Sequence, residues 1–200
     1  MLTGSLINVG TAVNKIAGVV ILDGRKDVTG NYEITYDEGD LKIEKRPLTI
    51  QGASDSKEYD GNPLTADSYE VIAGELPKNH KLSCTVTGEI IDAGRVENLV
   101  AATIENGEKQ DVTYNFLLTL YNGELEVTPI PITIKSESET KVYDGEPLKG
   151  VAEKCTISSV RQLLDGHVLK VTLMGEITEV GMTTNRIATV AIMDGNRDVT

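Results

Sequence analysis

Internal repetition is the feature that most constrains this chain, because a sequence that repeats at a fixed spacing folds into copies of one unit. The motif Tyr-Asp-Gly-x-Pro-Leu at residues 59–64 returns 84 positions later, at residues 143–148. A second signature, Gly-x5-Gly-x3-Asn, occurs three times, beginning at Gly4, Gly88 and Gly175. Each of its copies runs on to an Asp-Val-Thr triplet, at residues 27–29, 111–113 and 198–200.

The spacing of the motifs divides the chain into three parts. Residues 1–47 correspond to the C-terminal part of one repeat, residues 48–131 to a complete repeat of about 84 residues, and residues 132–200 to the N-terminal part of a third. We expect the chain to be a piece of a longer tandem array. Prolines stand at both boundaries, at Pro47 and within residues 127–132, with no Gly/Ser-rich stretch. Because proline fixes φ and favours extended neighbours, we predict stiff linkers and an elongated particle, which small-angle scattering would test.

Hydrophobic patterning within the parts is that of β-strands. Residues 81–87 alternate, with Leu82, Cys84 and Val86 on one face and polar residues on the other. The third part repeats this alternation at residues 169–173. Further short strands are predicted at residues 48–50, 95–104 and 132–134.

Turn residues predict where strands reverse. The pair Asn122-Gly123 between two apolar runs is typical of a two-residue hairpin turn, in which Gly123 would adopt a positive φ. In the first part we expect a turn at Gly39, between strands around 32–36 and 41–43. Both predictions place antiparallel strands side by side.

These patterns predict an all-β fold. About five to seven strands in a repeat, with turns every ~8–12 residues, indicate tandem small β-sandwiches of the Ig-like type. Only residues 160–164 resemble a helical turn. The alternative is a β-grasp-like α+β repeat, which would need a crossover helix packed on the sheet.

Composition argues against several classes of partner. The chain carries 19 basic and 31 acidic residues, and its net charge of −12 argues against nucleic acid and anionic membranes. No apolar run approaches the ~20 residues of a membrane-spanning helix, and the chain's start lacks the basic and apolar regions of a signal peptide. With 4% aromatic residues and no Trp, the core has to be mainly aliphatic. No Ser-His-Asp order, phosphate loop or carboxylate pair stands out, so we expect no enzyme.

The two histidines and two cysteines are candidate ligands or nucleophiles. His80 and His167 occupy equivalent places in different repeats, and neither has a Cys or a second His beside it to complete a metal site. We interpret each as a turn residue whose imidazole bonds a nearby backbone group. Cys84 takes an inward strand position, whereas Cys155 has no equivalent, so we expect two free, largely buried thiols.

Two further chemistries remain as alternatives. Asp and Asn crowd three loops, at residues 23–27, 37–40 and 194–198. Calcium takes such oxygen ligands, but no loop matches an EF-hand and both residue types favour turns, so we expect no cofactor, with calcium as the alternative. A covalent bond between Lys57 or Lys141 and Asn98 or Asn185 would need a neutral acid buried beside the pair. A mass deficit of one ammonia would reveal it.

The recurring motifs together resemble the tandem MBG/YDG-type repeats of bacterial cell-surface and adhesin-like proteins. The resemblance rests on the Tyr-Asp-Gly-x-Pro-Leu box, a Leu-x-x-Gly-His-like step, Gly-x5-Gly-x3-Asn, Asp-Val-Thr, and Asn-Tyr with a terminal Gly-x-Leu-x-Ile, and it covers essentially the whole chain. One departure lies at residues 76–80, which lack the glycine found as Gly166 before His167. The resemblance implies an extracellular, surface-attached, β-rich stalk or adhesin segment.

The expected function is therefore that of a non-catalytic structural spacer, with an extracellular binding module for a host glycan or protein as the alternative. A hydrolase appended to a surface protein is a third class. In the Tyr-Asp-Gly box we expect glycine to adopt positive φ, aspartate to begin an Asx-type turn, proline to fix the exit and tyrosine to fill the core. The residues expected to hold the fold are Tyr59, Asp60, Gly61, Pro63, Gly94, Asn98, Gly123, Tyr143, Asp144, Gly145, Pro147, Gly181 and Asn185.

Association between chains is a further expectation, beside contacts among neighbouring repeats. Residues 132–200 lack a counterpart of the strands at 31–44, and residues 1–47 lack those at 48–74, so both leave unpaired strand edges. Residues 31–47 of one molecule match the segment missing from the third repeat of another. We predict concentration-dependent head-to-tail self-association, which light scattering would test.

Overall fold

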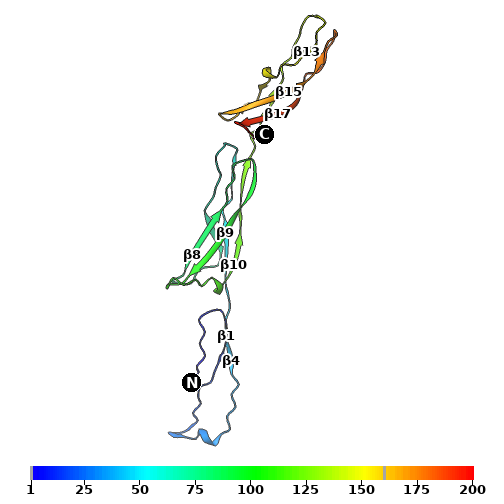
Figure 1. The fold of residues 1–200 in the computed structure, drawn as a ribbon. Coiled ribbons are helices and arrows are strands. Elements are labelled where there is room, and N and C mark those ends of the chain that lie inside the picture. The colour runs from blue at the N-terminus through cyan, green and yellow to red at the C-terminus, as the bar shows by residue number, and fades with distance from the viewer. Residues whose placement is uncertain (1, 160) are drawn as a thin grey trace. The chain divides into compact units, whose positions relative to one another are not determined.

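The computed structural model describes residues 2–159 and 161–200 and consists almost entirely of β-strands and loops (Figure 1). The helical pieces among these residues are three single 3-10 turns: η1 (Thr29–Asn31), η2 (Thr113–Asn115) and η3 (Ala152–Lys154). The predicted all-β class is thus confirmed. Residue 160, in the predicted helical turn, lies outside the described residues, and residues 161–164 have no regular structure. Within the described part of the chain, no helix is long and apolar enough to span a membrane.

Two compact units make up the structure. Unit 1 comprises residues Met1–Ser54, Ala66–Gly88 and Glu97–Glu124. Unit 2 comprises residues Asp55–Thr65, Glu89–Val96 and Leu125–Thr200. Each unit gathers segments that are distant in sequence, because β-pairing joins non-local strands. The repeat boundaries predicted after residues 47 and 131 stay predictions.

Unit 1 contains a parallel and several antiparallel strand pairs. Its strands are β1 (Gly10–Asn14), β2 (Leu22–Asp23), β3 (Lys26–Asp27), β4 (Gly39–Ile43), β5 (Arg46–Gly52), β7 (Tyr69–Ala73), β8 (Lys81–Thr87), most of β9 (Gly94–Glu105) and β10 (Phe116–Tyr121). β5 lies between β10 and β7, parallel to β10 and antiparallel to β7. β8 pairs antiparallel with β9, and the two lie side by side in Figure 1. β1 pairs antiparallel with β4, and β2 with β3.

The core of unit 1 is aliphatic apart from one ring. Its buried residues are Leu48, Ile50, Ile104, Val112 and Phe116, with half-buried neighbours from β8, β9 and β10 around them. Leu48 and Ile50 are two residues apart on β5, so both side chains point to the same face. The predicted alternation of residues 81–87 and 169–173 is confirmed, because burial alternates residue by residue along both segments.

The predicted hairpin at Asn122-Gly123 is wrong. β10 and β11 (Gly123–Thr128) do not pair with each other: β10 runs parallel to β5, and β11 runs parallel to β6 (Asp55–Glu58). Gly123 is a strand residue without positive φ. The glycine is needed for space, because a Cβ atom there would lie 1.9 Å from the carbonyl oxygen of Ala53. Asn-Gly favours a hairpin locally, but a backbone passing this close also demands glycine.

The predicted turn at Gly39 is also wrong, although an added Cβ atom there would meet no atom within 4 Å. Gly39 opens β4 and pairs with Asn14 at the end of β1, while residues 33–38 form no strand. Gly39 stands 84 positions before Gly123, and both glycines begin strands. The two wrong turn predictions therefore concern equivalent positions of the repeat.

Unit 2 combines one long antiparallel strand pair, His167–Met174 with Arg186–Asp194, with several strands of two residues. Besides β6 and most of β11, its strands are β12 (Ile134–Lys135), β13 (Leu148–Lys149), β14 (Thr156–Ile157), β15 (His167–Met174), β16 (Glu176–Ile177), β17 (Arg186–Asp194) and β18 (Arg197–Asp198). β12 pairs with β14, β13 with β16, and β17 with both β15 and β18, all antiparallel. Leu64, Leu125 and Val127 are its buried apolar side chains. Of the predicted strand at 132–134, only Ile134 belongs to a strand.

Candidate functional site

The three Asp-Val-Thr triplets adopt the same hydrogen-bonded turn. In the second triplet, the carboxylate of Asp111 accepts bonds from the backbone N–H of Thr113 (2.9 Å) and from its hydroxyl (2.6 Å). The Thr113 hydroxyl oxygen accepts the backbone N–H of Ile104 at 2.8 Å. Asp27 with Thr29 and Asp198 with Thr200 make the matching bonds in the other two triplets. Hydrogen bonds from the threonine hydroxyl, then from its N–H, lower the pKa of all three carboxyls.

The two Tyr-Asp-Gly boxes also form matching turns. Asp60 accepts the N–H of Asn62 at 2.9 Å, and Asp144 accepts the N–H of Glu146 at 3.0 Å, as an Asx-type turn requires. Gly61 has φ +78° and Gly145 φ +82°. The predicted roles of aspartate and glycine in the box are confirmed. After Pro63 and Pro147 the chain enters equivalent pairings, Leu64 with Ile90 and Leu148 with Ile177.

Each box holds a lysine against its aspartate. The Lys57 ammonium lies 2.6 Å from the Asp60 carboxylate and 2.7 Å from the carbonyl oxygen of Asn62. Lys141 lies 2.6 Å from Asp144 in the same way. This hydrogen bond is the largest cause that lowers the pKa of each aspartate. Both lysines, the candidates for a covalent bond to asparagine, thus have an aspartate partner within their own turn.

The recurring asparagines bond to backbone carbonyls. Asn98, the one fully buried polar side chain of the described residues, donates from Nδ2 to the carbonyls of Ala53 (2.8 Å) and Ala66 (2.5 Å). Asn185 donates to the carbonyl of Glu137 at 3.2 Å. Both amides therefore tie neighbouring segments together within their own unit.

The tyrosines of the two boxes differ. Tyr143 is 58% exposed, so its expected role in filling a core is wrong. Tyr59 is half-buried and lines a cavity of about 300 Å³ in unit 2. Of the other glycines expected to hold the fold, Gly94 has φ +152° and opens β9, whereas Gly181 lies in an exposed bend without positive φ.

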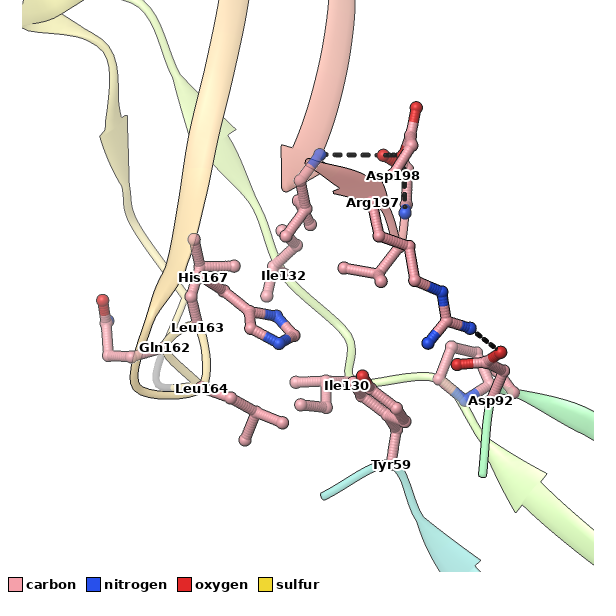
Figure 2. Close-up of a pocket in the computed structure, with 15 residues that line it drawn as sticks. Tyr59, Asp92, Ile130, Ile132, Gln162, Leu163, Leu164, His167, Arg197 and Asp198 are labelled. Carbon is pink, nitrogen blue, oxygen red and sulfur yellow. Dashed lines mark hydrogen bonds and ion pairs between the residues drawn. The ribbon is translucent and has the colours of Figure 1, made fainter. Parts of the chain in front are cut away.

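The cavity brings together two aromatic rings and an ion pair (Figure 2). The rings of Tyr59 and His167 lie 6.1 Å apart between centroids, inclined at 40°. Figure 2 shows the imidazole pointing toward the tyrosine ring, with Leu164 and Ile130 beside it. At the rim, the guanidinium of Arg197 pairs with the carboxylate of Asp92. The cavity thus offers apolar walls, one imidazole and one paired guanidinium, which suits binding or packing better than nucleophilic chemistry.

The histidines have different surroundings. His80 Nδ1 lies 3.1 Å from the carbonyl oxygen of Lys78, as predicted for a turn residue, and its ring packs against the ring of Phe116 in a T-shaped arrangement. His167 instead begins β15 and faces Tyr59. Sequence reasoning missed this pair, because Tyr59 and His167 stand far apart in sequence and nothing local links the two rings.

The structure also shows the surroundings of the two cysteines and of two of the three Asp- and Asn-rich loops. Cys84 and Cys155 are free and half-buried, and burial raises the pKa of the Cys84 thiol. The loops at 23–27 and 194–198 are tight hairpins, in which Gly24 and Gly195 have φ +59° and +57°. Across the described residues, no group of three or more His, Cys, Asp and Glu side chains could hold a metal ion.

Comparison with known proteins adds no relative. No family model, no curated protein and no solved structure matches this chain.

Proposed function

We propose that this chain is a non-catalytic spacer, a stalk segment of repeated β units in an extracellular, surface-attached bacterial protein of adhesin-like type. The resemblance of its motifs to MBG/YDG-type repeats supports this proposal. Neighbouring repeats of the same chain are then its main partners.

One observation carries the proposal: the carboxylates of the recurring aspartates accept their hydrogen bonds from groups inside their own turns. Three Asp-Val-Thr triplets and two Tyr-Asp-Gly boxes direct their carboxylates at N–H groups, hydroxyls and ammonium groups two to three residues away. Residues that recur for binding would present these groups to a ligand. Residues that recur for folding satisfy them internally, and a spacer needs only that each copy folds alike.

The test is whether the distance to which the chain projects a tag depends on its length. The chain is displayed on a bacterial surface between an anchor and an epitope tag, as it stands, with residues 48–131 duplicated, or with them deleted. Antibody access to the tag through a surrounding polysaccharide layer is measured. We expect access to rise with the added copy and to fall with the deletion. Access that does not depend on length would contradict the spacer.

The alternative is an extracellular binding module for a host glycan or protein, and the cavity at Tyr59 and His167 is the observation that favours it. An aromatic ring beside polar groups is a common element of ligand sites. A glycan and mucin binding screen would compare the chain with its Tyr59→Ala and Tyr143→Ala variants. Binding that Tyr59→Ala abolishes and Tyr143→Ala leaves intact would favour the module. Tyr143 is a matched control, since it holds the same motif position but is exposed.

A further inference from the structure

The parallel strand pairs β5–β10 and β6–β11, here called the clamp, are the feature from which we infer a mechanical role. We infer that the clamp makes residues 46–128 resist unfolding when the chain is pulled from its two ends. This inference rests on the proposed function, because a stalk on a surface carries the tension of whatever it holds.

The two ladders of the clamp share one register. β5 pairs with β10 through six consecutive residue pairs, from Arg46 with Phe116 to Gln51 with Tyr121. β6 pairs with β11 through four, from Asp55 with Leu125 onward. In every pair the two residues stand 70 positions apart. The strands with which the chain enters this segment are therefore paired with the strands by which it leaves.

Parallel pairing decides how tension acts on these hydrogen bonds. Two parallel strands begin at the same end, so pulling on the start of β5 and on the end of β10 slides one strand along the other. All hydrogen bonds of the ladder then carry the load together. In β8 and β9, which are antiparallel, the outer ends Lys81 and Glu105 lie opposite each other. Pulling there opens the bonds one after another, which takes less force.

Buried side chains cover one face of β5 and one face of β11. Leu48 and Ile50 of β5 are buried, as are Leu125 and Val127 of β11. A buried hydrogen bond that breaks without a replacement from water costs more than an exposed one. β5 and β11 therefore each have one face that is buried away from water.

Hydrogen bonds also join residues 51–54, at and after the end of β5, to residues 122–124, which follow β10. The Gln51 side-chain amide donates to the carbonyl of Asn122 at 3.2 Å. The backbone N–H of Glu124 donates to the Ser54 hydroxyl at 2.9 Å. The missing side chain of Gly123 lets the two backbones pass in contact. These contacts hold residues 122–124 beside residues 51–54 within unit 1.

The experiment compares two pulling directions in one protein by single-molecule force spectroscopy. Both versions carry Cys84→Ala and Cys155→Ala, which remove the native thiols, and Lys45→Cys as one handle. The second handle is Pro129→Cys in the shearing version and Tyr114→Cys in the peeling version. Residue 129 follows the end of β11, whereas Tyr114 is exposed and stands just before β10, whose start pairs with the start of β5.

We expect a severalfold higher unfolding force in the shearing version than in the peeling version, at the same loading rate. Equal unfolding forces in the two versions would contradict the mechanical role inferred for the clamp. Because both versions share the same background substitutions, any weakening of the fold lowers both forces and leaves their ratio readable. The display assay separates this result from the proposed function, since a spacer without a clamp still raises its epitope with length.

Discussion

Replacing Gly123 by alanine tests the close contact between β11 and the segment before β6. The added Cβ atom would lie 1.9 Å from the carbonyl oxygen of Ala53, where ordinary contact begins near 3.4 Å. The strands must therefore separate by about 1.5 Å, because the obstacle is backbone and cannot rotate away. The reason is space, and not the left-handed conformation that a hairpin turn would have required.

The cost follows from what the separation breaks. The bonds from Gln51 to the carbonyl of Asn122 and from the N–H of Glu124 to Ser54 would lengthen beyond hydrogen-bonding distance. Two such bonds contribute about 1–3 kcal/mol, and residual crowding adds about 1 kcal/mol, so Gly123→Ala should lower the free energy of unfolding by about 2–4 kcal/mol.

Two other glycines of unit 1 supply graded controls. At Gly52 the nearest atom to an added Cβ is a side-chain methyl of Val100 at 2.5 Å, a less severe approach than the 1.9 Å to backbone at Gly123, so Gly52→Ala should cost less. At Gly107 the nearest atom is 3.4 Å away, and Gly107→Ala should change stability by no more than about 0.5 kcal/mol. Urea unfolding followed by far-ultraviolet circular dichroism measures all three. Equal midpoints for Gly123→Ala and Gly107→Ala would refute the reasoning.

Three further outcomes are expected. Hydrogen bonds in the folded state lower the pKa of the turn aspartates below 3.8, so they add stability above that pH that is lost as the pH falls through the lowered values. Acid titration of the unfolding midpoint should show this loss, and Asp111→Asn should reduce it; an unchanged acid profile would contradict the turn network. Asn98→Ala leaves two carbonyl groups without their donor and should lower the free energy of unfolding by about 2–4 kcal/mol. Asn185→Ala should lower it less, because the Asn185 side chain makes one, longer bond. Equal losses in urea unfolding would contradict this difference. Burial raises the pKa of Cys84, so Ellman's reagent should modify it more slowly in the folded protein than in urea, and equal rates would show that the thiol is open.

Much of the local structure could be predicted from the sequence. The alternation of residues 81–87 indicated a strand with Cys84 facing inward, and the structure confirms both. The Asx turns at Asp60 and Asp144 and the positive φ of Gly61 and Gly145 were also predicted correctly. These features succeed for one physical reason. Each depends on a residue and its neighbours within a few positions, so composition and spacing contain the whole cause.

Strand partners and the cavity could not be predicted in this way. Asn122-Gly123 carries a local hairpin signal, yet β10 and β11 pair with strands 70 positions earlier in the chain. Tyr59 and Tyr143 hold the same motif position, but Tyr59 is half-buried beside a histidine ring and lines a cavity, whereas Tyr143 is exposed. By itself the sequence determined the Asx turns of the two boxes, the strand faces at residues 81–87 and 169–173, and the all-β class. Which strands pair, and which tyrosine is covered, was decided by the tertiary structure, because the energy of a non-local contact depends on both partners at once.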